Sequence, residues 1–93
     1  MSTEITDNAG KNRYEIRVDG DLAGFVDYER EEGSVVLVHT EVDSAFEGKG
    51  IGSALARGAL DDIRGKGAAV VPVCPFIKKW IEKHPDYQDL VAS

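Results

Sequence analysis

Residues 34–53 read SVVLVHTEVDSAFEGKGIGS and contain the pattern that decides the fold. The first nine residues, 34–42, predict a strand, and its successive apolar residues 35–38 are typical of a central strand covered on both faces. After residues 43–47, three glycines stand at alternate positions, 48, 50 and 52. From Ile51 apolar residues recur every four positions to about Arg64, as on one face of a helix. The stretch therefore predicts a strand, a glycine-rich turn and a helix in succession.

The segments on both sides of this stretch extend the pattern. Residues 13–18 alternate apolar and polar side chains, and the turn pair Asp19-Gly20 leads into a returning strand at 22–28. Beyond the helix, residues 68–74 form a short apolar strand, which the helix should bring back parallel to the central strand. Residues 76–83 predict a second short helix, with apolar residues on one face.

These elements predict one α/β (α+β) domain over residues 13–93. We expect a mixed four-stranded sheet and two helices, in the order strand, strand, strand, helix, strand, helix. The first three strands should be antiparallel and the last one parallel to the third. Residues 1–12 are polar and without a period, so they are a flexible N-terminal lead-in or, alternatively, a short edge strand.

Composition narrows the classes of function. Eleven Lys and Arg against seventeen Asp and Glu give a net charge of −6, which argues against nucleic acid as the partner and favours a small or basic substrate such as an amine. No apolar run reaches the ~20 residues that span a bilayer and no signal peptide is visible, so we expect a cytoplasmic protein without a membrane partner. One Cys and two His cannot assemble a four-ligand Cys/His zinc site, and no metal is expected.

The glycine run at residues 48–52 has a functional and a simpler interpretation. Bare backbone at a helix N-terminus lets an anionic ligand approach unpaired N–H groups, and Lys49 adds a positive charge. The run is neither a nucleotide P-loop nor a dinucleotide fingerprint, because no Gly-Lys-Ser or Gly-Lys-Thr is present and Ser53 or Leu55 stands where the third glycine is required. The simpler interpretation is a tight strand-to-helix turn.

Pro72 is the second informative residue. It has no N–H to donate to a sheet, so inside an apolar strand it indicates an edge, a bulge or a break in pairing. If the two parallel strands part there, backbone groups of residues 40–42 lack strand partners, and an amide-bearing ligand arm can bond to them. A strand that simply ends at Val71 explains Pro72 equally well.

Four segments together resemble the small single-domain branch of the GNAT N-acetyltransferase superfamily. They are residues 39–42 (HTEV), 47–52 (EGKGIG), 71–76 (VPVCPF) and 84–87 (HPDY). The resemblance extends over residues 13–91. The phosphate-binding motif of the superfamily is Gln/Arg-x-x-Gly-x-Gly/Ala, and Gly50-Ile51-Gly52 match its last three positions. Glu47 stands where Gln or Arg is usual, which puts the role of that side chain in doubt.

The resemblance implies that residues 13–93 are a GNAT-like domain that binds acetyl-coenzyme A. The pyrophosphate would sit on the backbone amides of residues 48–53, and the pantetheine arm would pair with the strand near Pro72. The residues implied in coenzyme binding are Glu41, Val42, Gly48, Lys49, Gly50, Ile51, Gly52, Ser53, Cys74, Pro75 and Lys79. Lys78 and Lys79 reach the coenzyme phosphates in this interpretation and form a solvated helix face in the simpler one.

Acetyl transfer to an amine needs a deprotonated nucleophile and an acid for the leaving thiolate. His39 and Glu41 are two residues apart, so we expect them on one face of the strand, at the end of the apolar row of Val35 and Leu37, as a general base. Cys74 is either an acetyl-accepting nucleophile activated by His39 or the acid for the leaving coenzyme. The simpler alternatives are a solvated Glu41, a hydrogen-bonded His39 and a buried structural Cys74.

The predicted function is therefore an acetyl-coenzyme A-binding N-acetyltransferase that moves an acetyl group to an amine, either a small molecule or a Lys side chain of a protein. The alternative is a non-catalytic module that binds coenzyme A, acyl-coenzyme A or another protein, because so short a chain leaves few residues for a substrate pocket. A purely structural domain is the third possibility. We expect a monomer or a weak dimer.

Overall fold

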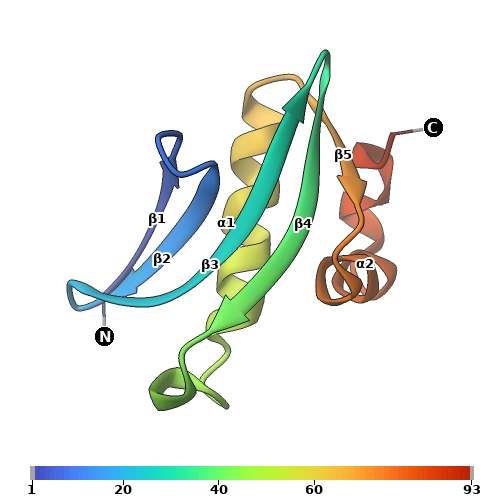
Figure 1. Ribbon diagram of the computed structural model, residues 1–93. Coiled ribbons are helices and arrows are strands. Elements are labelled where there is room, and N and C mark those ends of the chain that lie inside the picture. The colour runs from blue at the N-terminus through green and yellow to red at the C-terminus, as the bar shows by residue number, and fades with distance from the viewer. Residues whose placement is uncertain (1, 93) are drawn as a thin grey trace.

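Five strands form one sheet, and two α-helices pack against it (Figure 1). The computed structural model describes residues 2–92. The elements are β1 (Thr3–Asn8), β2 (Arg13–Val18), β3 (Asp21–Glu31), β4 (Ser34–Val42), the 3₁₀ turn η1 (Ser44–Phe46), α1 (Ile51–Gly65), β5 (Ala69–Pro72), α2 (Pro75–Glu82) and η2 (Pro85–Leu90). Within the described residues, no helix is long and apolar enough to cross a membrane.

The sheet has the order β1-β2-β3-β4-β5. Neighbouring strands are antiparallel from β1 to β4, whereas β4 and β5 are parallel, because α1 carries the chain back along the sheet. The predicted class and the parallel last pair are confirmed, but the predicted number of four strands is wrong. Residues 3–8 form β1 at the edge of the sheet, which is the alternative of a short edge strand for residues 1–12. Ile5 is the only apolar residue of β1, so its side chains show no strand period, and pairing with β2 defines the strand.

Both α-helices pack on the same side of the sheet. The indole nitrogen of Trp80 in α2 donates a hydrogen bond to Ser53 Oγ in α1 at 2.9 Å. Leu55 and Ile63 of α1 are fully buried in the shared core. In β4, by contrast, Val38 is 39% exposed. The expectation that this strand is covered on both faces is therefore wrong, because one face packs against the helices and the other is open.

Gly58 in the middle of α1 allows β1 to pack closely on the helix. A Cβ atom on Gly58 would lie 2.6 Å from Ile5 Cγ1 and 3.1 Å from Ile5 Cβ, too close unless the strand moves. We expect Gly58→Ala to lower the free energy of unfolding by about 1–2 kcal/mol, although Ala normally stabilises a helix interior by about 1 kcal/mol relative to Gly. Chemical denaturation measures the difference.

Gly65→Ala is the matched control, because a Cβ in the last turn of α1 meets nothing within 4 Å. This change should stabilise the protein through helix propensity alone. Gly58→Ala combined with Ile5→Ala should destabilise less than the sum of the two single changes, since the shorter side chain removes the clash. Stabilisation by Gly58→Ala alone would contradict the close packing of β1 on α1.

Candidate functional site

The glycine loop forms an open cradle where β4 leads into α1. Gly48 and Gly50 have φ values of +79° and +74°, which L side chains rarely adopt, and a Cβ on either would project into open space. Gly50 is the N-cap of α1 without a side-chain cap, and the helical bonds begin with Ala54 N donating to Gly50 O at 3.0 Å. The N–H groups of residues 51–53 precede this bond, so they have no acceptor inside the helix. The positive end of the helix dipole favours an anion there.

Side chains border this cradle on two sides. A Cβ on Gly52 would lie 3.0 Å from Phe76 Cζ, so the absent side chain lets the Phe76 ring approach the start of α1. On the loop itself, Lys49 Nζ lies 5.9 Å from the centroid of the Phe46 ring. The predicted loop residues, 48–53, are therefore together at one helix N-terminus, with α2 beside them.

The parallel strands separate next to the cradle. Strand pairing ends at Leu37 and Pro72, and Leu37 O accepts from both Val73 N (3.1 Å) and Cys74 N (2.9 Å). β4 continues to Val42, and among residues 2–92 no strand pairs with this last part on the β5 side. This end of β5 at Pro72, with α2 beginning at Pro75, fits the strand that simply ends at least as well as the predicted parting of the two strands. It leaves an extended backbone edge free to bond to a ligand.

A register shift decides which side chains of β4 face the helices. The residues of β3 pair with Leu37 and then with His39, so Val38 is an extra residue without a partner. A bulge of this kind changes the alternation of side chains along the strand. After it, Thr40 lies on the helix side like Leu37, and His39 lies on the open face.

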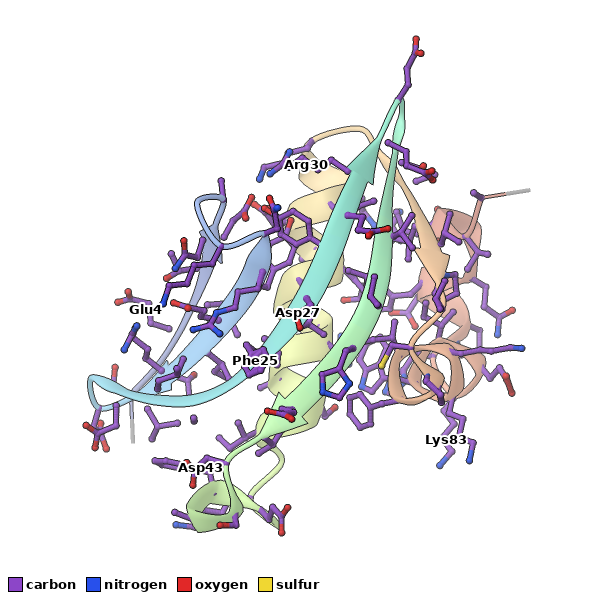
Figure 2. The ribbon with its side chains drawn as sticks, viewed as in Figure 1. Glu4, Phe25, Asp27, Arg30, Asp43 and Lys83 are labelled. Atoms are coloured by element: carbon purple, nitrogen blue, oxygen red, sulfur yellow. The ribbon has the colours of Figure 1, made fainter. Side chains whose placement is uncertain are left out.

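The His39–Glu41 pair therefore lies on the open face of the sheet. His39 Nε2 is 3.3 Å from Glu41 Oε1, and the side chains are 55% and 62% exposed. The His39 ring is 6.4 Å from the ring of Phe25, which extends from β3 on the side turned away from α1 (Figure 2). The prediction that His39 and Glu41 share a face is confirmed. The prediction that this face continues the buried apolar row of β4 is wrong, because the bulge at Val38 reverses the alternation.

Cys74 lies on the helix side of the gap. It is 3% exposed, and its Sγ is 3.2 Å from Thr40 Oγ1. The structure therefore brings Cys74 to Thr40, while His39 faces the other side of β4. The sequence analysis missed Thr40, because the simple alternation of a strand assigns residues 37 and 40 to opposite faces.

The predicted coenzyme residues of α2 lie beside the cradle. Pro75 is the first residue of the helix. Lys79 lines a hollow of about 190 Å³ together with Phe76, Trp80 and Lys83. Lys78 lines a different hollow, next to Pro72 and the C-terminal segment. Among the residues that the structure describes, no three His, Cys, Asp or Glu side chains are grouped so that they could hold a metal ion.

The fold and the candidate site combine an open glycine loop at the start of α1 with two parallel strands that stop pairing at Leu37 and Pro72. The chain matches the GCN5-related N-acetyl-transferase family over residues 13–90 and belongs to that family. The family carries out acetyl transfer in general.

Solved structures show the same fold. A protein from Staphylococcus aureus described as GCN5-like superposes with a TM-score of 0.72 at 24% identity, over 97% of this chain and 88% of its own. The ribosomal-protein-alanine N-acetyltransferase from Brucella melitensis biovar Abortus 2308 superposes with a TM-score of 0.57 at 25% identity, over 87% of this chain and 61% of its own.

Similar sequences are found among curated proteins. Protein NATD1 from Xenopus tropicalis is 36% identical over 52 residues, which are 56% of this chain and 48% of that protein. Protein NATD1 from Homo sapiens is 37% identical over 51 residues, which are 55% of this chain and 45% of that protein. The matched segment spans about half the length of these relatives.

Proposed function

We propose that the protein binds acetyl-coenzyme A and transfers its acetyl group to a primary amine, either a small molecule or a Lys side chain. One observation carries the proposal: the open cradle of residues 48–53 comes five residues after the part of β4 that pairs with β3 but has no strand partner on the β5 side. An anion site and an unpaired strand edge thus lie next to each other. Coenzyme A has a diphosphate joined to an arm with two amide groups, and this arrangement suits both parts.

The chain's own groups fit this ligand. The backbone N–H groups of residues 51–53 suit a diphosphate, and Lys49 can neutralise part of its charge. The free edge of β4 from His39 to Val42 can pair with the amides of the arm as a neighbouring strand would. Acetyl-coenzyme A supplies an acetyl group already activated as a thioester.

Two groups of side chains are placed for proton transfer in this proposal. The His39–Glu41 pair on the open face takes the proton from the attacking amine, which can reach it from solvent. The Cys74 Sγ–H, with Thr40 Oγ1 at 3.2 Å, gives a proton to the departing sulfur of the coenzyme. Because His39 faces the other side of β4, the acid role suits Cys74 better than that of a nucleophile activated by His39.

Thermal unfolding with candidate ligands tests the proposal. Acetyl-coenzyme A and coenzyme A at 100 times their Kd should each stabilise the protein by about 2.7 kcal/mol, and ATP and NAD should not stabilise it. Incubation with acetyl-coenzyme A and an amine should release free thiol at a rate that depends on the amine. Absence of stabilisation by both forms of the coenzyme would overturn the proposal.

A non-catalytic coenzyme A-binding module is the second candidate. The observation that favours it is the open face beside His39 and Glu41, where both side chains are more than half exposed. Neither helix covers that face, so nothing encloses an acceptor. Stabilisation by the coenzyme without thiol release, over a panel of small amines and Lys-containing peptides, would decide for the binding module.

Replacement of Cys74 tests its assigned role. We expect Cys74→Ala to lower the rate of amine-dependent thiol release by about 10–100-fold and to leave the affinity for coenzyme A nearly unchanged, because the change removes a proton donor and no phosphate contact. Thr40→Val should have a smaller effect in the same direction. Full turnover of Cys74→Ala would contradict the acid role. An acetyl adduct on Cys74 of the wild-type protein, found by mass spectrometry without amine, would indicate the nucleophile instead.

A further inference from the structure

A stripe of aromatic and cationic side chains runs along α2 beside the glycine cradle. Lys79 and Trp80 are three and four residues after Phe76, and Lys83 is four and three residues after them, so the four side chains lie on one face of the helix. These four residues line the hollow of about 190 Å³. Figure 2 shows the Lys83 side chain extending outward from the end of α2. The hollow therefore combines an aromatic surface with two ammonium groups.

The hollow begins where the cradle ends. Phe76 Cζ lies 3.0 Å from the position of a Cβ on Gly52, and Trp80 Nε1 donates to Ser53 Oγ at 2.9 Å. These contacts hold α2 against the first turn of α1. A ligand whose phosphates occupy the cradle can therefore reach the hollow without any movement of the two helices.

The two aromatic rings differ in accessibility. Phe76 is 42% exposed, so one side of its ring is available to a ligand. Trp80 is 6% exposed, and its ring stacks on His84 at 3.8 Å. Phe76 is thus the open stacking surface, and Trp80 forms the rigid floor of the hollow.

The two lysines that line this hollow have no salt-bridge partner among the described residues. Within the described part of the chain, neither Lys79 nor Lys83 forms a salt bridge, whereas Arg13, Arg17 and Arg30 all pair with carboxylates. The chain as a whole carries a net charge of −6. Two unpaired lysines on an aromatic surface in an acidic protein suit a ligand with an aromatic ring and a phosphate.

We propose that the stripe binds the 3′-phosphoadenosine end of coenzyme A, with the adenine ring on Phe76 and the 3′-phosphate between Lys79 and Lys83. The inference rests on the proposed function, because it requires the diphosphate of the same molecule on the glycine loop. It also predicts a preference for coenzyme A over 3′-dephospho-coenzyme A. The two compounds have the same diphosphate and the same thiol arm, so the preference depends on the 3′-phosphate alone.

Titrations with these two compounds test the proposal, with calorimetry and the fluorescence of Trp80, the only tryptophan of the chain, as readouts. The wild-type protein should bind coenzyme A about tenfold more tightly than the dephospho form. Lys79→Gln combined with Lys83→Gln should remove this preference by weakening the binding of coenzyme A alone. Lys11→Gln, in the turn between β1 and β2, should leave both affinities unchanged.

The outcomes distinguish failure of the proposed 3′-phosphate site from failure of the proposed function. Equal affinity of the wild-type protein for the two compounds, or a preference that survives in the double variant, overturns the 3′-phosphate site and leaves the proposed function standing. Failure of both compounds to bind overturns the coenzyme assignment and the 3′-phosphate site together. Phe76→Ala should weaken both compounds to the same extent, because both carry the adenine ring.

Discussion

Replacing Gly50 by Val is expected to lower the affinity for coenzyme A by about tenfold or more. Gly50 has a φ of +74° and is the N-cap of α1. A branched side chain at this position projects into the open space of the cradle and is strained at positive φ. Calorimetric titration of the folded variant measures the loss, and circular dichroism establishes that the variant is folded.

Gly33→Val separates the loss of the cradle from the backbone strain. Gly33 has a φ of +78°, and a Cβ there also meets nothing within 4 Å. It lies in the turn between β3 and β4, at the end of β4 away from the cradle (Figure 1). Both variants should lose a similar amount of stability, but only Gly50→Val should lose affinity. Equal affinities of the two variants would place the diphosphate elsewhere.

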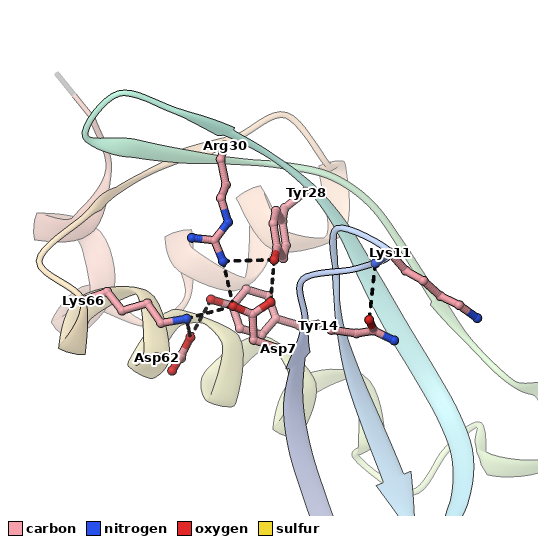
Figure 3. Close-up of polar contacts among 8 residues, drawn as sticks. Asp7, Lys11, Tyr14, Tyr28, Arg30, Asp62 and Lys66 are labelled. Atoms are coloured by element: carbon pink, nitrogen blue, oxygen red, sulfur yellow. Dashed lines mark hydrogen bonds and ion pairs between the residues drawn. The ribbon is translucent and has the colours of Figure 1, made fainter.

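Replacing Asp7 by Asn is expected to lower the free energy of unfolding at neutral pH by about 2 kcal/mol. Asp7 is the centre of a polar cluster that joins β1 to β3 and α1 (Figure 3). Its carboxylate accepts a hydrogen bond from the Tyr28 hydroxyl and lies 2.8 Å from both Arg30 Nη2 and Lys66 Nζ. The side chain is 15% exposed, and removing its charge leaves Arg30 without its carboxylate and Lys66 with Asp62 alone.

The same variant should change the dependence of stability on pH. Burial raises the pKa of Asp7, but the hydrogen bonds from Lys66 and Tyr28 and the charges of Lys66 and Arg30 outweigh it, and the pKa lies below its ordinary value of 3.8. A pKa lowered by folding stabilises the protein above the pKa of the unfolded chain, and this stabilisation is lost as the pH falls through the folded pKa. Below about pH 4 the wild-type protein should therefore lose stability more steeply than Asp7→Asn.

Asp89→Asn is the control for an exposed ion pair. Asp89 pairs with Arg64 at 2.9 Å, but its side chain is 66% exposed. Water and salt screen such a pair, so the variant should keep the melting temperature of the wild-type protein. Thermal unfolding between about pH 7 and pH 2 measures all three proteins. Equal behaviour of the two variants would contradict a special contribution of Asp7.

Those parts of the candidate site could be predicted from sequence in which the allowed backbone conformation of a single residue determines the local structure. Gly48 and Gly50 adopt positive φ because they lack a Cβ, and this requirement is visible from their position between a strand and a helix. Pairing with β4 ends at Pro72, but the missing N–H of Pro72 is not the cause, because Ala69 N and Val73 N donate toward β4 and the alternate residues face the other edge of β5. The conformation of the glycine loop thus follows from local constraints, whereas the end of the pairing between β4 and β5 does not.

The face on which each side chain lies could not be predicted in this way. The bulge at Val38 places His39 and Glu41 on the open face and brings Thr40 to Cys74. Nothing in residues 34–42 marks Val38, because the extra residue appears only when β4 is paired with β3. The edge strand β1 could not be predicted from its own residues either, because its pairing with β2 and the contacts of Asp7 hold it in place.

The sequence by itself determined the α+β order and the glycine loop at the start of α1. Each depends on the conformational limits of residues that are close together in the chain. Only the tertiary structure decided that β1 joins the sheet, that the open face carries the His39–Glu41 pair and that Thr40 is the partner of Cys74. These features depend on register between segments that are far apart in sequence, and a side-chain period within one segment contains no information about how it pairs with another.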